Sequence, residues 1–207
     1  MDKVLIIGGG GFGRHLKSNL KDFNFGKLLF SGFFDKDLKL KTKLNEKNIN
    51  KTIIKNSLFA NGIGNFAHSW YPTVFSKYLV QKYKFINLIH NTALISNDVK
   101  IGTGSTFMEN SLVKSNSKIG NFCIINSSAI ISHDVNIGHF CHVSLGAKVG
   151  GNCVIGNNSF LGINASVIQG IKIGSNSIIG AGAVVTKDVG DNVVVIGNPA
   201  FEYRDNN

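Results

Sequence analysis

The stretch that decides the fold runs from residue 149 to residue 174 and reads VGGNCVIGNNSFLGINASVIQGIKIG. Every sixth residue in it is large and apolar, and the same spacing extends well beyond it in both directions. The 17 residues of this column are Ile89, Ile95, Ile101, Phe107, Val113, Ile119, Ile125, Ile131, Ile137, Val143, Val149, Ile155, Leu161, Val167, Ile173, Ile179 and Val185. A six-residue period fits neither a 3.6-residue helix nor the simple alternation of a half-buried strand.

A second column, four residues after the first, is small: 16 of its 17 members are Ala, Ser, Cys or Val. Glycine often follows the large residue directly, at Gly102, Gly120, Gly138, Gly150, Gly156, Gly162, Gly174 and Gly180. This pattern predicts short strands joined by tight turns, stacked so that the apolar column is buried continuously. Glycine is expected at the bends because it tolerates backbone angles that are closed to other residues.

Charge divides the chain at the start of this repeat. The 207 residues carry a formal net charge of +10. Residues 1–88 hold 15 Lys and Arg against 5 Asp and Glu, whereas residues 89–207 hold 7 of each. We therefore predict two domains, 1–88 and 89–207.

Composition bounds the class of protein. With 43% hydrophobic and 16% charged residues the chain should fold rather than stay disordered. No apolar run approaches the roughly 18 residues of a membrane span, and the N-terminus does not resemble a signal peptide. The three cysteines form no CxxC pair, which favours reduced thiols and a cytoplasmic location.

The first domain opens with the pattern of a phosphate-binding turn. A buried strand is expected at 4–7, the glycines of 8–13 match GxGxxG, and a helix should follow at about 12–20. Free N–H groups and the helix dipole at such a turn favour an anion. In the alternative interpretation, these glycines only pack the helix against the strand. A second strand is expected at 28–34, ending at Asp35, which lies where an acidic residue can meet a ribose hydroxyl.

Residues 1–88 are too few for a complete dinucleotide-binding fold, which needs two mononucleotide-binding halves. The sequence predicts a Lys/Asn-rich loop at 36–50, a strand near 57–60, a glycine-containing turn at 61–65 and a helix at about 72–83. This single β-α-β-β-α-β unit suffices for one nucleotide.

Both predicted domains resemble parts of known protein families. The hexapeptides resemble those of the left-handed parallel β-helix acyltransferases, in which three hexapeptides form one triangular coil, and residues 197–200 (GNPA) resemble the exit motif of that family. A short Rossmann-like domain followed by such coils resembles the PglD/NeuD group of sugar acetyltransferases, most specifically at residues 133–147, HDVNIGHFCHVSLGA. The junction 87–93 is also similar, although Asn91 stands where the family often has proline.

The resemblance implies an α/β Rossmann-like half domain followed by an all-β left-handed parallel β-helix, assembled as a homotrimer with active sites between subunits. It also implies transfer of acetyl from acetyl-CoA to the amino group of a UDP- or dTDP-linked amino-dideoxy sugar in bacterial surface-glycan synthesis. His133 would be the general base, because a neutral imidazole can take the proton of the attacking amine. Asp134 would orient it, and Gly151, which lies 18 residues beyond His133, would offer a backbone N–H to the thioester oxygen.

The remaining site residues follow from the same resemblance. Acetyl-CoA would contact four residues: His142, Gly151, Ile163 and Ala181. The nucleotide sugar would contact seven residues: Gly10, Gly11, Phe12, Asp35, Lys36, Gly62 and Asn126. The family often has histidine where Phe12 stands.

Several alternatives stay open. O-acetylation of sialic acid is the close rival, and N- against O-acetylation is not fixed. A solenoid that binds nucleic acid would need a basic face with aromatic side chains between the basic ones. A redox-linked regulator that binds NAD would need a full-sized dinucleotide-binding domain. His133, His139 and His142 are of a residue type that binds zinc, but His139 and His142 should face different directions, so no metal is expected.

Overall fold

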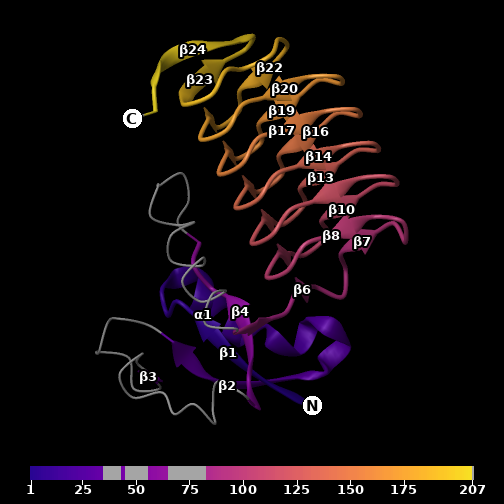
Figure 1. Ribbon diagram of the computed structural model, residues 1–207, viewed down its shortest axis with the longest axis vertical. Helices are drawn as coiled ribbons and strands as arrows, with labels where there is room; N and C mark the ends of the chain where they lie inside the picture. Colours follow the sequence, from indigo (N-terminus) through magenta and orange to yellow (C-terminus); the bar gives the residue numbers. More distant parts are fainter. Residues whose placement is uncertain (35–42, 45–55, 65–82, 207) are drawn as a thin grey trace.

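The computed structural model describes residues 1–34, 43–44, 56–64 and 83–206. An α/β region at the N-terminal end is followed by a stack of short strands that continues to the C-terminus (Figure 1). This stack is a β-solenoid of about six turns. Among the described residues, no helix combines the length and the apolar character that a membrane span requires.

The N-terminal region is built on a five-stranded sheet in which every neighbouring pair of strands is parallel. Its spatial order is β3 (Lys43–Leu44), β2 (Leu28–Phe34), β1 (Asp2–Ile7), β4 (Leu58–Asn61) and β5 (Lys84–Phe85). Helix α1 (Gly11–Ser18) and two 3₁₀ turns, η1 (Leu20–Asp22) and η2 (Asn24–Gly26), connect β1 to β2. The strands expected from the sequence at 4–7, 28–34 and 57–60 correspond to β1, β2 and β4.

Two expectations for this region need comment. β3 lies inside the stretch predicted as a loop, because Lys43 and Leu44 pair with Phe33 and Phe34 and extend the sheet beyond β2. The helix expected at 72–83 lies outside the described residues except for Tyr83, which is buried and not helical.

The solenoid has three faces, and each is formed by one parallel sheet. In the first face, the antiparallel strand β24 extends this sheet at its end. The first face contains β6 (Leu88–Ile89), β9 (Thr106–Phe107), β12 (Ile124–Ile125), β15 (His142–Val143), β18 (Phe160–Leu161), β21 (Ile178–Ile179), β23 (Val193–Gly197) and β24 (Ala200–Asp205). The second face contains β7 (Leu94–Ile95), β10 (Leu112–Val113), β13 (Ile130–Ile131), β16 (Lys148–Val149), β19 (Ser166–Val167) and β22 (Val184–Val185). The third face contains β8 (Lys100–Ile101), β11 (Lys118–Ile119), β14 (Asn136–Ile137), β17 (Val154–Ile155) and β20 (Lys172–Ile173).

The hexapeptide prediction is confirmed strand by strand. Each large apolar residue of the repeat is the second residue of a two-residue strand, from Ile89 in β6 to Val185 in β22. Successive coils stack with an 18-residue offset, so that Ile131 pairs with both Val113 and Val149. The large and small columns together form one buried core that runs through the solenoid.

The reason given for the glycines that follow the large residues is wrong. None of these eight glycines has a positive φ; the left-handed position lies two residues later and is occupied by residues such as Phe122, Asn152 and Asn158. A Cβ on Gly120 would instead lie 2.4 Å from the carbonyl oxygen of Gly138 in the next coil. These glycines are therefore required by the close approach of stacked backbones rather than by a bend.

Three corners join the faces. The chain passes from the first to the second face at the first corner (residues 90–93, 108–111, 126–129, 144–147, 162–165 and 180–183). It passes from the second to the third face at the second corner (residues 96–99, 114–117, 132–135, 150–153 and 168–171). The segment 197–200, singled out as an exit motif, is the turn between β23 and β24, which pair antiparallel at the far end of the stack (Figure 1).

Apolar packing and backbone bonds join the N-terminal sheet to the first coils. Phe122 and Ile124 of the solenoid share one buried cluster with Leu5, Ile7 and Phe59, and Leu88 and Met108 belong to a second such cluster. Asn91 contributes at this junction: its N–H donates to the carbonyl of Asp22, and its side-chain oxygen accepts the N–H of Phe25. Proline, common there in the resembling family, has no N–H and could not make the first of these bonds.

Candidate active site

His133 and Asp134 lie at the second corner, between β13 and β14. Asp134 has a φ of 60°, and its Oδ2 lies 2.7 Å from Nδ1 of His133. A carboxylate oxygen only accepts, so Nδ1 carries the proton and donates it to Asp134. The Nε2 lone pair is therefore left available on an exposed ring.

Asp134 is held in its ionised form by two donors. The hydrogen bond from His133 lowers the pKa of this carboxyl below its usual value, and a hydrogen bond from the amide of Asn116 adds to the effect. Asn116 lies one coil earlier, 18 residues before Asp134. Sequence reasoning missed Asn116, although the 18-residue stacking rule finds it.

Gly151 lies directly against the imidazole of His133, one coil further along the second corner. A Cβ at this position would be 2.8 Å from Cε1 and 3.0 Å from Nε2 of His133. The two coils are kept in register by a hydrogen bond of 3.1 Å from the N–H of Asn152 to the carbonyl of His133. The N–H of Gly151 has no partner among the described residues, so it can donate to a ligand placed beside the ring.

Asn126 and His142 form a second group, at the first corner and on the first face. Asn126 Nδ2 lies 3.1 Å from Nε2 of His142, and Oδ1 of Asn126 accepts the N–H of Ser127 at 2.8 Å. Burial lowers the pKa of His142 to about 3, so the ring is neutral. Because an amide nitrogen only donates, Nε2 of His142 is the acceptor in this pair.

Ile163 and Ala181 continue this first corner toward the C-terminus. They follow Ser127 and Leu145 at intervals of 18 residues, so the corner presents a polar part near the N-terminal region and an apolar part beyond it. Leu145 and Ile163 are unusual for large apolar residues because they expose 44% and 48% of their surface.

The structure therefore places the predicted solenoid residues in two groups rather than one. His133, Asp134 and Gly151 lie at the second corner, and Asn126, Ile163 and Ala181 lie at the first corner with His142 close by. No hydrogen bond or ring contact within the described chain joins the two groups.

The candidates in the N-terminal region lie at the end of β1. At the start of α1, no atom of the described residues lies within 4 Å of a Cβ placed on Gly10 or Gly11, whereas a side chain on Gly62 would collide with Ile6 and with the carbonyl of Gly8. Close packing of the two turns thus explains Gly62, and Gly64 similarly packs against Phe12. The predicted residues Asp35 and Lys36 lie outside the described residues.

The other histidines and the cysteines behave as expected from their positions. His139 is exposed and its Nδ1 accepts the N–H of Asn121, whereas His142 is buried. Cys123 and Cys141 are fully buried in the solenoid core. In the part of the chain that the structure describes, no group of three or more His, Cys, Asp or Glu side chains is placed to hold a metal ion.

Comparison with protein families gives two matches, both in the solenoid. The model described as "Bacterial transferase hexapeptide (six repeats)" matches residues 152–187, and "Hexapeptide repeat of succinyl-transferase" matches residues 128–161. Both matches therefore concern the hexapeptide repeat of the solenoid. Comparison with the sequences of curated proteins gives no match.

The likeness to solved structures extends over nearly the whole chain. A histidine mutant of perosamine N-acetyltransferase from Caulobacter crescentus, in complex with CoA and GDP-perosamine, is 26% identical over 99% of this chain and 98% of its own, with a TM-score of 0.86. The acetyltransferase domain of PglB from Neisseria gonorrhoeae, in complex with acetyl coenzyme A, is 26% identical over 97% and 98%, with a TM-score of 0.86. WeeI from Acinetobacter baumannii is 27% identical over 98% and 100%, also with a TM-score of 0.86.

The low pKa of His142 predicts an acid-sensitive solenoid. The unfolded chain protonates this histidine near pH 6.5 but the folded chain only near pH 3, so the stability it contributes is present above pH 6.5 and is lost as the pH falls toward 3. We expect the melting temperature to fall over this window, and to fall less in His142→Leu. Thermal unfolding followed by circular dichroism checks this, and equal slopes for the two proteins would contradict it.

Proposed function

We propose that the chain is an acetyl-CoA-dependent N-acetyltransferase that acts on the amino group of a nucleotide-linked amino sugar. The observation that carries this proposal is the imidazole of His133, which has its Nδ1 held by Asp134 and its Nε2 available beside Gly151. The likeness to an enzyme solved with CoA and GDP-perosamine supports the substrate class. Such a sugar would serve surface-glycan synthesis, and acetyl-CoA as the donor favours a cytoplasmic location.

His133 acts as the general base in the proposed reaction. The neutral amine of the sugar forms a bond to the thioester carbonyl carbon while its proton passes to Nε2 of His133. The C–S bond then breaks, and the leaving sulfur takes the proton from His133, so that an amide and free CoA are formed. Asp134 keeps the ring in the required tautomer, and the N–H of Gly151 donates to the carbonyl oxygen as negative charge develops on it.

The first corner fits the acyl donor. Leu145 and Ile163 offer exposed apolar surface, and the small Ala181 leaves room beside them for a pantetheine arm. His142 is neutral and buried, so it adds no charge beside an apolar chain. We therefore assign acetyl-CoA to the column of Leu145, Ile163 and Ala181, next to His142.

The N-terminal region fits the nucleotide. Its sheet order, β3-β2-β1-β4-β5 with parallel pairing, follows the strand order of the Rossmann fold beyond the three strands of one half, which supports a Rossmann-like domain. The start of α1 lies at the end of its central strand. We propose residues 1–88 as this domain, with the diphosphate at Gly10, Gly11 and Phe12, and residues 89–207 as the catalytic domain. The bonding of Asp35 and Lys36 to the base or ribose stays a prediction.

Placing a carboxylate at the start of α1 tests the nucleotide site. Gly11 has open space and no positive φ, so Gly11→Asp is accommodated, and an acidic residue in the first turn of a helix is favourable by about 0.3–1 kcal/mol. We expect the melting temperature to stay equal or rise, while the affinity for UDP, GDP and dTDP falls at least several-fold. Calorimetry with the three nucleotides checks this; the uncharged variant Gly11→Asn is the control, and unchanged affinity in Gly11→Asp would contradict the site.

The separation of the two groups supports a homotrimer. His133 and Asn126 lie at different corners of one solenoid, so a site that uses both must combine the second corner of one subunit with the first corner of a neighbour. A closed ring of three subunits forms three such sites. We propose this assembly, with coils that wind left-handed as in the resembling family.

Complementation between variants tests the shared site. His133→Ala and Asn126→Ala are each expected to be nearly inactive, but refolding them together in equal amounts should restore about a quarter of the wild-type activity, because one interface in four pairs two intact corners. Native mass spectrometry would confirm the mixed trimers. Mixed trimers without any recovered activity would contradict the division of the site between subunits.

A panel of acceptors tests the proposed function itself. Release of free CoA is followed with acetyl-CoA and UDP-, dTDP- or GDP-linked amino sugars, each matched by the sugar in which a hydroxyl replaces the amine. We expect release with at least one amino sugar and not with its hydroxyl partner. Release with sialic acid instead would favour the O-acetyltransferase alternative, and tight oligonucleotide binding without CoA release would favour a nucleic-acid-binding protein.

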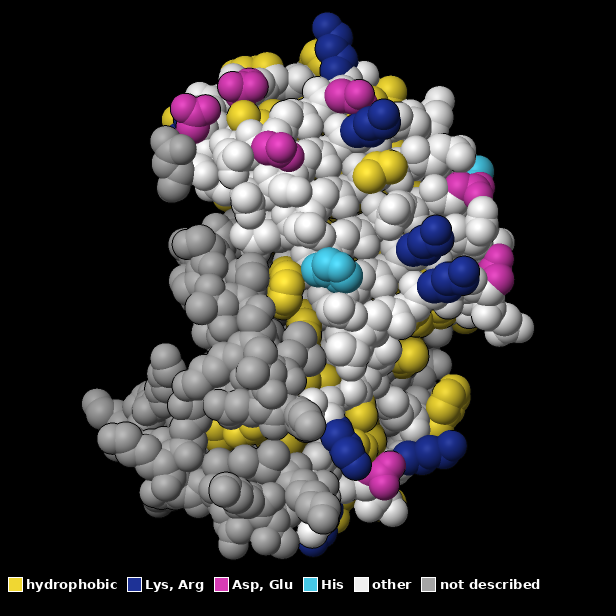
Figure 2. Space-filling model, in the orientation of Figure 1, with side chains coloured by type: hydrophobic (Ala, Val, Ile, Leu, Met, Phe, Trp, Pro, Cys, Tyr) yellow, Lys and Arg dark blue, Asp and Glu magenta, His cyan; other side chains and the backbone are white. Residues whose placement is uncertain are grey.

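Figure 2 shows charges of both signs scattered over the solenoid in the face in view, rather than one basic patch.

A further inference from the structure

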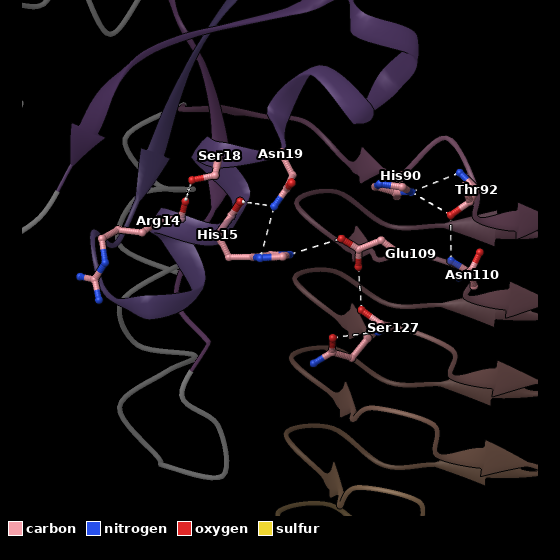
Figure 3. Close-up of polar contacts among 10 residues, drawn as sticks. Arg14, His15, Ser18, Asn19, His90, Thr92, Glu109, Asn110 and Ser127 are labelled. Carbon is pink, nitrogen blue, oxygen red and sulfur yellow. Dashed lines mark hydrogen bonds and ion pairs between the residues drawn. The ribbon is translucent and has the colours of Figure 1, made fainter.

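A chain of polar side chains links α1 to the first corner of the solenoid (Figure 3). Nε2 of His15, on α1, lies 3.3 Å from Oε1 of Glu109. The other carboxylate oxygen of Glu109 accepts a 2.6 Å hydrogen bond from the hydroxyl of Ser127, which lies 18 residues further along the same corner. Glu109 thus lies between the two regions of the chain and contacts both.

The direction of each hydrogen bond in this series of side chains can be assigned. The amide nitrogen of Asn19 lies 3.3 Å from Nδ1 of His15. Because an amide nitrogen can only donate, Nδ1 is an acceptor and the proton of a neutral His15 lies on Nε2, where it points to Glu109. The contact between α1 and Glu109 therefore needs no protonated imidazole.

Beyond Ser127 the series of hydrogen bonds continues to Asn126, which lies in the proposed site for the sugar. The N–H of Ser127 donates to Oδ1 of Asn126, which fixes the orientation of that amide, and Nδ2 of Asn126 then donates to His142. Its second N–H has no partner among the described residues, so it is available to a substrate. The residue that holds α1 thus also anchors the corner that carries Asn126.

Glu109 is ionised in this position. Burial raises the pKa of its carboxyl, but the hydrogen bonds from Ser127, from its own backbone N–H and from His15 together outweigh burial and leave the pKa below the usual value. The pair with His15 is only partly buried, with side-chain exposures of 47% for His15 and 28% for Glu109. A pair this exposed adds little to stability, whereas apolar clusters already hold the two regions together.

We propose that Glu109 is a positioning residue, which fixes α1 relative to Asn126 and so sets the distance between the nucleotide and the sugar amine. This inference rests on the proposed function. The same eight-residue helix carries Gly11 and Phe12 at its start and His15 one turn later, so a shift at Glu109 moves the nucleotide turn directly. Neither the hexapeptide pattern nor the glycine turn singles out Glu109.

Steady-state kinetics of Glu109 variants test this role. In Glu109→Ala we expect the KM for the nucleotide sugar to rise about five- to tenfold, the effect of one or two lost hydrogen bonds, while the KM for acetyl-CoA and the melting temperature stay close to wild type. Glu109→Gln keeps an acceptor for Ser127 and should restore most of the affinity. His15→Ala should raise the same KM, and the double variant should be no worse than Glu109→Ala alone.

Thr92→Val is the matched control. Thr92 lies one coil earlier, and its hydroxyl bonds to the N–H of Asn110 and to His90 without touching α1 (Figure 3). Its kinetics should equal those of wild type. Equal increases in both KM values, no rescue by Glu109→Gln, or a matching effect of Thr92→Val would overturn the positioning role.

Hydrogen exchange separates this inference from the proposed function. Amides of α1 should exchange faster in Glu109→Ala than in wild type or in Thr92→Val, whatever the substrate is. Faster exchange together with an inactive wild-type protein would count against the proposed acetyltransferase while supporting the contact. Unchanged exchange in an active enzyme would overturn the positioning role alone.

Discussion

Replacing His133 with alanine is expected to lower kcat/KM for the amino sugar by about 10²–10⁴-fold, the usual contribution of a positioned general base. The side chain is exposed and, among the described residues, bonds only to Asp134, so its removal leaves the apolar core intact. The melting temperature and the KM for acetyl-CoA should therefore change little. Initial rates of CoA release at saturating acetyl-CoA measure the effect.

His139→Asn is the matched control for this variant. His139 is also an exposed corner histidine, six residues further along the chain, and it accepts the N–H of Asn121, a bond that asparagine can replace. We expect wild-type rates in this variant. Equal losses in the two variants, or full activity in His133→Ala, would contradict the role of His133.

Adding one methyl group at Gly151 is expected to have the second largest effect. In Gly151→Ala the new Cβ would lie 2.8 Å from Cε1 of His133, closer than atoms approach in folded proteins, so the ring has to move. A displacement of about 1 Å in a reacting group costs on the order of 10²-fold in rate. We expect this loss in kcat, with a cooperative unfolding transition close to that of wild type.

Gly190→Ala serves as the control for a glycine-to-alanine change in the solenoid. A Cβ at Gly190 meets no atom within 4 Å, and its φ is not positive. This variant should keep the activity and the stability of wild type. If Gly151→Ala were as active as Gly190→Ala, the imidazole could not be acting from its position against Gly151.

The solenoid was predictable because its physical cause is local and repeated. Each large residue must point inward for a coil to bury its core, so Ile131, Val149 and their equivalents fix both the strands and their 18-residue register. The site at the second corner follows from the same rule: Gly151 lies one coil beyond His133, and Asn116 one coil before Asp134.

Other features could not be read from that pattern. The periodicity does not say that Gly120 is needed for close approach to the next coil, because this depends on the distance between stacked backbones. β24 is antiparallel and follows the last repeat, so the six-residue column does not extend to it. His15 and Glu109 are 94 residues apart, and only the docking of the two regions brings them together.

The resemblance implies active sites between subunits, but it does not say which residues each corner supplies. The sequence assigns His133 and Asn126 to one site by resemblance, but β13 carries the chain from the first corner, with Asn126, to the second corner, with His133. The triangular cross-section, rather than sequence spacing, decides which side chains face one another. A partner subunit is the simplest way to bring these corners together.

Acetyl transfer to nitrogen is tested most directly by following the label from acetyl-CoA carrying ¹³C in its carbonyl carbon. After reaction with the preferred nucleotide-linked amino sugar, we expect the label as an amide on the sugar nitrogen, in an amount equal to the free CoA released, and absent with His133→Ala. Label recovered as acetate or as an ester on a sugar hydroxyl, or retained on CoA with every amino sugar tested, would contradict an N-acetyltransferase.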